Sequence, residues 1–158
     1  MIDASNNPDC GGGCLLPILD DRFNTTVQEY VEIIRDLTGI DAVARVKDIA
    51  LRRGVKASSV STAIGNLKLL GLIDHKHYGY VELTHDGREL GETLSRRHAL
   101  IHCFLRDILG LEGEAADAEA CRLEHSMSGE TLDALIAYVT RIKGCPWCGV
   151  KQPHRRGF

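Results

Sequence analysis

Three short stretches of the chain place metal-binding side chains one helical turn apart. These are Glu29 and Glu32 in the first stretch, His98 and His102 in the second, and Cys121, Glu124 and His125 in the third. Residues three or four positions apart share one face of an α-helix. Three helices that carry these stretches can therefore present seven donors to one metal site.

The donor types narrow the choice of metal. Carboxylates and imidazoles suit Mn²⁺ and Fe²⁺, whereas the thiolate of Cys121 moves the preference toward Fe²⁺, Co²⁺ or Zn²⁺. The sequence therefore predicts Fe²⁺ or Mn²⁺ as the cofactor, with Zn²⁺ or Co²⁺ able to substitute, and leaves the choice among them open.

Each donor taken alone also has a simpler interpretation. Glu29 can close a capping box with Thr26, Glu32 can be a solvated surface residue, and Cys121 can be a small core residue. The order and spacing of all three stretches together favour metal ligation. The predicted ligands are Glu29, Glu32, His98, Cys121, Glu124 and His125, with His102 as an additional candidate.

The segment between the first and second stretches has the pattern of a DNA reader. Apolar residues at helical spacing predict helices over 26–38, 46–53 and 58–70, and a glycine follows each of them. The last two helices are separated by residues 54–57, as in a helix-turn-helix. Residues 72–83 then alternate around Tyr78-Gly79, which predicts a two-stranded wing. A plain helical core with solvated serines is the alternative.

The predicted second helix of this motif offers small polar side chains to a DNA groove, and lysines flank it. The predicted base readers are Ser58, Ser59, Ser61, Thr62 and Asn66, and the predicted phosphate contacts are Lys56, Lys68 and Lys76. The chain carries a net charge of −3, but its basic residues concentrate in 45–76 and its acidic ones in 112–130. This asymmetry favours DNA binding by the basic segment and cation binding by the acidic segment.

The rest of the chain predicts a mainly α fold. A long helix from Thr84 should end at Gly110, and two more helices should carry Cys121–His125 and the segment after a Ser128 cap. We predict an arm (1–22), a winged helix-turn-helix domain (23–85), a helical metal-binding and dimerisation domain (86–142) and a tail (143–158). The sequence lacks a signal peptide and a membrane span, which predicts a cytoplasmic protein.

The predicted arm and tail contain two cysteine pairs, Cys10 with Cys14 and Cys145 with Cys148. A Cys-x-x-Cys followed by glycine is typical of one knuckle of a zinc ribbon, and the two pairs together can form a structural Zn²⁺ site. A redox pair and plain unpaired thiols are the alternatives. A zinc- or thiol-redox-responsive winged-helix regulator is therefore the second functional hypothesis.

Residues 97–111, followed by 121–128, resemble the metal-binding and dimerisation domain of the diphtheria-toxin-repressor family of iron- and manganese-dependent repressors. The resemblance covers about residues 24–140 and includes 29–37 and Ser58-Ser-Val-Ser. It implies a homodimer that binds a palindromic operator on double-stranded DNA when loaded with divalent metal and represses metal-uptake genes. The family is not enzymatic, and the chain offers no Ser/His/Asp set or phosphate loop.

The resemblance also assigns ligands by position. Glu29 and Glu32 match the manganese-responsive branch, Cys121 matches the iron-responsive branch, and His98, Glu124 and His125 match both. His102 replaces a glutamate, and Asp117 replaces a histidine of the iron branch. The chain also ends before the SH3-like third domain of longer members, which predicts a short form.

Overall fold

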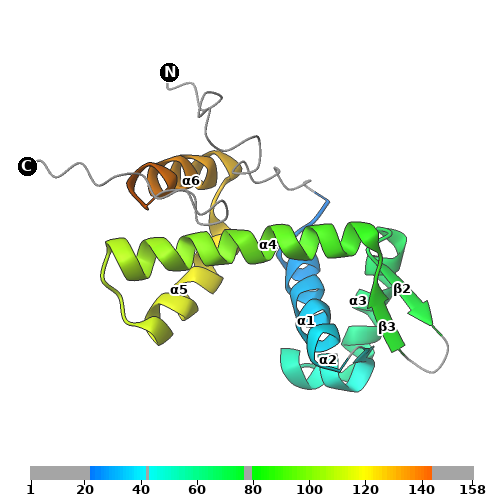
Figure 1. Ribbon diagram of the computed structural model, residues 1–158. Coiled ribbons are helices and arrows are strands. Elements are labelled where there is room, and N and C mark those ends of the chain that lie inside the picture. Colours follow the sequence, from blue (N-terminus) through cyan, green and yellow to red (C-terminus); the bar gives the residue numbers. More distant parts are fainter. Residues whose placement is uncertain (1–21, 42, 77–79, 144–158) are drawn as a thin grey trace, which may run out of the picture. The chain divides into compact units, whose positions relative to one another are not determined.

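The computed structural model describes residues 22–41, 43–76 and 80–143. These residues are mainly helical, with one small antiparallel sheet (Figure 1). They form two compact units, of which one ends at Ser95 and the other contains the described residues from Arg96 onward. The predicted fold class, a winged helix-turn-helix followed by a helical domain, is confirmed.

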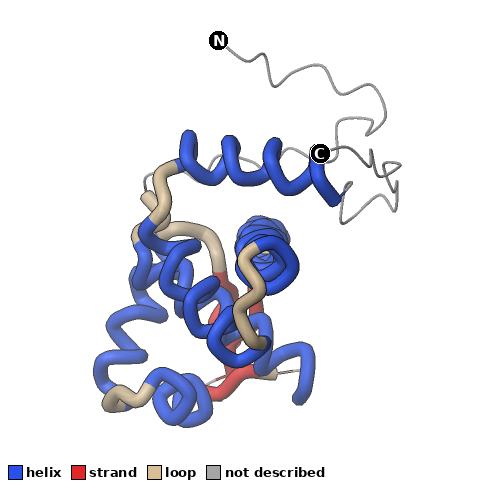
Figure 2. The backbone as a smooth tube through the Cα atoms, turned by 90° about the vertical axis from the view of Figure 1, so that its left-hand side faces the viewer, coloured by secondary structure: helices blue, strands red, loops and turns tan. Residues whose placement is uncertain are grey.

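The first unit is built as a winged helix. Its elements are α1 (Thr25–Asp41), β1 (Ala44–Arg45), α2 (Val46–Arg53), α3 (Ala57–Leu69), β2 (Ile73–Lys76) and β3 (Tyr80–Leu83). The strands, red in Figure 2, form an antiparallel sheet in the order β1-β3-β2, and β2 with β3 forms the wing. The predicted Tyr78-Gly79 turn lies outside the described residues.

Helix α1 begins and ends beyond its predicted bounds. The Asn24 side-chain oxygen accepts a hydrogen bond from the Val27 N–H at 3.0 Å, so Asn24, and not Thr26, caps the helix. At the other end, α1 continues through Gly39 to Asp41. Glycine lowers helix propensity but does not forbid helical angles, so the predicted stop at Gly39 was wrong.

The turn between α2 and α3 requires a glycine. Gly54 has φ 70° and ψ 32°, a left-handed conformation that side chains with a Cβ rarely adopt. Its N–H donates to the Leu51 carbonyl at 3.3 Å, and the next N–H, of Val55, donates to the Ala50 carbonyl at 3.1 Å. These bonds close α2 where the sequence predicted and set the start of α3.

The second unit contains the end of α4 (His85–Cys103), a π-helical turn η1 (Phe104–Ile108), α5 (Gly113–Ser126) and α6 (Gly129–Lys143). The predicted single helix from Thr84 to Gly110 is therefore interrupted by the π turn. Gly110, with φ 75°, lies just beyond its end. The predicted Ser128 cap is confirmed, because its Oγ accepts from the Thr131 N–H at 3.3 Å.

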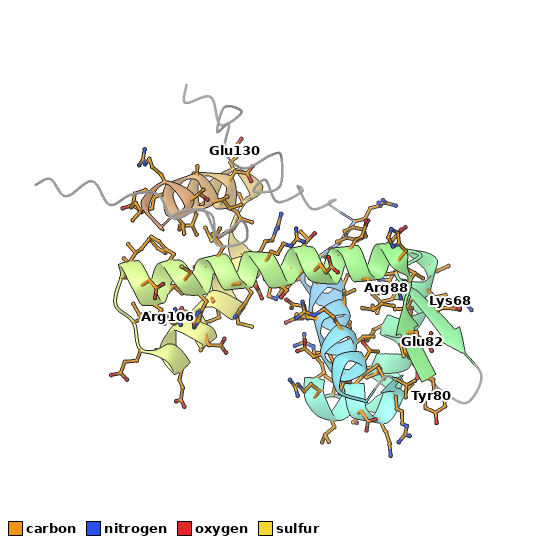
Figure 3. The ribbon with its side chains drawn as sticks, in the orientation of Figure 1. Lys68, Tyr80, Glu82, Arg88, Arg106 and Glu130 are labelled. Atoms are coloured by element: carbon orange, nitrogen blue, oxygen red, sulfur yellow. The ribbon has the colours of Figure 1, made fainter. Side chains whose placement is uncertain are left out.

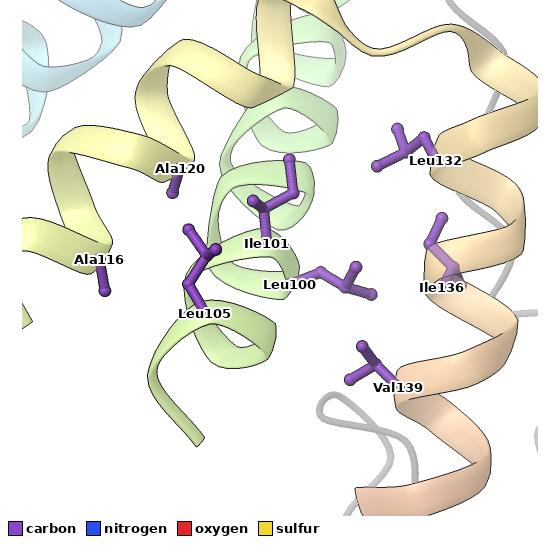
Figure 4. Close-up of a cluster of buried hydrophobic side chains, with 8 residues drawn as sticks. All are labelled: Leu100, Ile101, Leu105, Ala116, Ala120, Leu132, Ile136 and Val139. Atoms are coloured by element: carbon purple, nitrogen blue, oxygen red, sulfur yellow. The ribbon is translucent and has the colours of Figure 1, made fainter. Parts of the chain in front are cut away.

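A tight apolar core holds these helices together (Figure 4). Its buried members are Leu100, Ile101, Leu105, Ala116, Ala120, Leu132, Ile136 and Val139. The alanines of α5 let it approach α4 closely, because small side chains shorten the distance between packed helices. Full burial of each large aliphatic side chain contributes roughly 1.5–3 kcal/mol, so the end of α4 and α5, which carry His98 and the Cys121–His125 group, are firmly packed together. No described helix is long and apolar enough to cross a membrane.

Candidate metal centre and DNA-binding surface

Helix α5 brings three predicted ligands together. The donor atoms of Cys121, Glu124 and His125 all lie within 4.8 Å of one another. Their spacing of three and four residues puts them on one helical face, as the sequence indicated. Glu124 is 4% exposed and Cys121 is exposed, so the group runs from the interior to the surface.

Helix α4 adds His98 to this group. Its Nδ1 lies 3.2 Å from Oε2 of Glu124, and its Nε2 lies 3.0 Å from Oδ1 of Asp117. The other oxygen of Glu124, Oε1, lies 3.4 Å from Nε2 of His125. One buried carboxylate therefore lies between imidazoles from two helices.

The carboxylates change the protonation of His98. Its pKa is raised to about 9, chiefly by the hydrogen bond to Glu124 and further by that to Asp117, against a lowering by burial. This raised pKa favours the imidazolium form at neutral pH, and the two ring nitrogens then face Glu124 and Asp117. An imidazole nitrogen must lose its proton before it can bind a metal, so metal and proton compete for His98.

A second cation supports the same carboxylate. Arg97 is 6% exposed, and burial lowers its pKa while Asp133 and Glu124 raise it. A buried ionised group is tolerated in a protein when it is paired or held in a network. Arg97 and the imidazolium form of His98 both offset the charge of Glu124. A carboxylate, a thiol and imidazoles grouped in this way fit a divalent transition-metal ion.

Two further residues lie beside His98. The ring of His102 stacks on it, with centroids 6.3 Å apart and an interplanar angle of 15°. Asp117 contacts it directly. In the sequence, Asp117 stands out only as a departure from the iron branch, because a lone aspartate fourteen residues beyond the end of α4 at Cys103 carries no spacing signal.

The two predicted ligands on α1 belong to the first unit. Glu29 forms an ion pair with Arg53 of α2, and Glu32 is partly buried. The capping-box alternative for Glu29 does not hold, because Asn24 caps the helix. The role of both glutamates as ligands stays a prediction.

Most of the predicted DNA contacts lie on the exposed side of α3. Ser58, Ser59, Ser61, Thr62, Asn66, Lys56 and Lys68 are all exposed, and Lys68 is labelled in Figure 3. Lys76 is the last residue of β2. Opposite this face, Val60, Ile64 and Leu67 are buried and fix the helix on its unit. The terminal cysteines Cys10, Cys14, Cys145 and Cys148 lie outside the described residues.

A cation–π contact with no signal in the sequence joins the edge strand β1 to the central strand β3. The guanidinium carbon of Arg45 lies 5.5 Å from the centroid of the Tyr80 ring. Ala44 and Arg45 pair with Val81 and Tyr80, so β1 attaches the wing to the start of α2. A strand of two residues is too short to show alternation, which is why it was not predicted.

The second unit also has an open apolar groove of about 570 Å³. Its lining residues are Ile101, Phe104, Ile108, Leu109, Leu123, Met127, Thr131, Leu135 and Tyr138. Leu109 is 56% exposed and Tyr138 is 40% exposed. Exposed apolar side chains gathered in one place are typical of a surface that binds another protein.

A winged helix followed by a helical unit with clustered metal-binding side chains defines a metal-responsive DNA-binding regulator. Residues 22–81 match the N-terminal DNA-binding domain of the iron-dependent repressors, and residues 84–153 match their metal-binding and dimerisation domain. The chain therefore belongs to the iron-dependent repressor family, whose members are metal-dependent DNA-binding transcriptional repressors and not enzymes.

Individual relatives agree with this assignment. The transcriptional regulator MntR of Salmonella typhimurium is 37% identical over 112 residues, which cover 71% of each chain. A manganese-dependent transcriptional repressor solved with manganese superimposes with a TM-score of 0.64 at 32% identity, covering 73% of this chain and 53% of its own. ScaR, solved with bound Zn²⁺, gives 0.64 at 28% identity, covering 75% and 56%. The chain thus spans about half the length of these solved relatives.

Proposed function

We propose that this protein represses metal homeostasis genes in the cytoplasm in response to Fe²⁺ or Mn²⁺. The observation that carries the proposal is the grouping of Cys121, Glu124 and His125 within 4.8 Å, with His98 in contact with Glu124. The proposed ligands are Glu29, Glu32, His98, Cys121, Glu124 and His125, with His102 as an additional donor. Zn²⁺ and Co²⁺ are expected to bind the same donors, because thiolate and imidazole favour them.

The carboxylates act as the switch in this proposal. Without metal, Glu29, Glu32 and Glu124 cannot approach one another closely without repulsion or protonation, so the two glutamates of α1 have no electrostatic reason to join the group on α5. A bound divalent cation supplies the positive charge that reverses this balance. The carboxylates of α1 then become ligands, and the DNA-binding unit is restrained relative to the metal-binding unit.

We further propose that the protein acts as a homodimer. The apolar groove with Leu109 and Tyr138 is the surface that a second copy would cover. A two-fold symmetric dimer recognises a palindromic operator only when its two reading helices match the half-site spacing. Ordering by metal would therefore raise operator affinity without any metal–DNA contact, typically by about 5- to 150-fold.

The exposed face of α3 supports the proposed DNA contacts. Small polar side chains, Ser58, Ser59, Ser61, Thr62 and Asn66, would reach base edges, and Lys56, Lys68 and Lys76 would contact phosphates. Loss of one lysine should weaken binding to all sequences and reduce the dependence on salt, whereas loss of a base reader should relax specificity.

Anaerobic binding to promoter fragments tests the proposal. The wild-type protein and a His98→Ala/His125→Ala double variant are titrated with Mn²⁺, Fe²⁺, Co²⁺ and Zn²⁺ separately. Metal-dependent binding by the wild type that is lost in the double variant is expected, and the series ranks the metals. Promoter binding that is the same with and without metal, and in the wild type and the double variant, would contradict the proposal. It would favour a regulator that works through the terminal cysteines.

The cysteine pairs have a proposed role of their own. The spacing of Cys145 and Cys148, followed by glycine, supports a structural Zn²⁺ site completed by Cys10 and Cys14. Zinc stoichiometry of the wild-type protein and of a variant with all four cysteines changed to serine tests it. One zinc ion per chain lost in that variant is expected, and an unchanged stoichiometry would contradict it.

A further inference from the structure

The carboxylate of Glu29 already has a cationic partner. Oε2 of Glu29 accepts a hydrogen bond from Nη2 of Arg53, and the two groups form an ion pair. The side chains are 25% and 33% exposed, so the pair is only partly screened by solvent. The contact connects α1 to the last residue of α2, the first helix of the helix-turn-helix.

The neighbouring arginine makes a looser version of the same contact. Nη2 of Arg52 lies 3.8 Å from Oδ2 of Asp36, which is two turns farther along α1, and these side chains are 55% and 42% exposed. Two adjacent arginines on α2 thus meet two carboxylates on α1. Only one of these carboxylates, Glu29, is a proposed metal ligand, so the chain provides its own matched control.

A guanidinium and a divalent cation on one carboxylate oppose each other. Each needs the oxygen lone pairs, and if they share the carboxylate the two positive groups lie within a few ångströms and repel. An arginine that merely oriented a ligand would strengthen metal binding, as hydrogen-bonded partners of ligands usually do. A full positive charge beside the cation works in the opposite direction.

We propose that Arg53 competes with the metal ion for Glu29 and so raises the metal concentration at which the sensor responds. This inference rests on the proposed role of Glu29 as a ligand. Metal binding then exchanges a contact between α1 and α2 for a contact with the metal, so occupancy of the site is linked to the restraint on the helix-turn-helix. Partly exposed ion pairs are modest in strength, so removal of Arg53 should increase metal affinity about two- to fivefold.

The test measures Mn²⁺ and Zn²⁺ affinity of the full-length protein without DNA, by competition with a fluorescent chelator. Arg53→Ala should bind both metals about two- to fivefold more tightly, and Arg52→Ala should match the wild type. Glu29→Gln should bind more weakly, and adding Arg53→Ala to it should change nothing further. If Arg53→Ala does not fold, Arg53→Gln keeps much of the side-chain stem and removes the charge.

The outcomes separate the two proposals. Unchanged or weaker binding in Arg53→Ala and Arg53→Gln, together with weaker binding in Glu29→Gln, would overturn the competition while leaving Glu29 a ligand. Wild-type affinity in Glu29→Gln would remove Glu29 from the ligand set and overturn this inference with it. An equal gain in Arg52→Ala would show a general charge effect and would also overturn the competition.

Discussion

Glu124 and Glu29 are both proposed ligands, but the protein holds them differently. Glu124 is 4% exposed and has imidazoles from α4 and α5 on its two oxygens. Glu29 is 25% exposed, belongs to the other unit and is bound to an arginine of α2. In the proposed site, Glu124 is thus packed among other proposed ligands of its own unit, whereas Glu29 is bound to a different partner. Metal affinity should therefore come from the group around Glu124 and regulation from Glu29.

The largest effect should come from Glu124. Glu124→Gln removes the only buried carboxylate of the group on α5 and leaves Arg97 beside a neutral amide, so metal affinity should fall by at least about 100-fold. Competition with a fluorescent chelator measures the Mn²⁺ affinity of the variant and of the wild type. Glu119→Gln, on the same helix but outside the group, should bind Mn²⁺ with wild-type affinity. A loss of Mn²⁺ affinity below tenfold in Glu124→Gln would show that Glu124 is not the main source of metal affinity.

A smaller loss is expected at Glu29. Because Glu29 must first leave Arg53, Glu29→Gln should weaken Mn²⁺ binding by only about tenfold. The same substitution should reduce metal-dependent operator binding more strongly than metal binding, since it disconnects α1. If Glu29→Gln reduced Mn²⁺ affinity and metal-dependent operator binding equally, Glu29 would contribute only to metal affinity, as Glu124 does.

Cys121 should affect metal preference more than overall affinity. Cys121→Ser replaces a soft thiolate with a hard oxygen, so Zn²⁺ and Co²⁺ affinity should fall about tenfold relative to Mn²⁺ affinity. The Co²⁺ absorption spectrum provides a direct check in a protein whose Cys10, Cys14, Cys145 and Cys148 are changed to serine, because the sulfur-to-cobalt charge-transfer band should vanish when Cys121→Ser is added to it. A band that persists would assign the thiolate ligand to another cysteine.

The smallest effect should be a pH dependence of the metal-free protein. The folded pKa of His98, about 9, lies above its ordinary value of 6.5, so its ion pairs stabilise the fold fully below pH 6.5 and are lost as pH rises through 9. Urea unfolding should show a decrease on the order of 1 kcal/mol between pH 6.5 and 9.5, allowing for solvent screening. His98→Ala should lack this decrease; an identical decrease in the variant would contradict the assignment.

Much of this arrangement could be predicted from local pattern. The bounds of α2 follow from Val46 and the left-handed Gly54, and the grouping of Cys121 with Glu124 and His125 follows from helical periodicity alone. Such features depend on neighbours within one turn. The role of each donor as a metal ligand, by contrast, remains a prediction.

Other features had no local signal. The π turn at Phe104–Ile108 leaves the apolar spacing helical, so it resembles a continuous helix. The Glu29–Arg53 pair joins residues 24 positions apart, and its formation depends on how α1 packs on α2. In the sequence Gly87 looks like an ordinary helical glycine. In the structure a Cβ at this position would lie 2.0 Å from the Leu72 carbonyl oxygen, so the packing there requires glycine. Tertiary packing decides each of these.

Hydrogen exchange of α1 shows whether a bound metal ion recruits this helix. The full-length protein is compared metal-free and saturated with Zn²⁺, with Glu29→Gln as the control variant. Metal should protect the backbone amides of α1 in the wild type, and this protection should be lost in Glu29→Gln while that of α5 remains. Equal exchange of α1 with and without metal in the wild type would contradict the claim that metal recruits this helix.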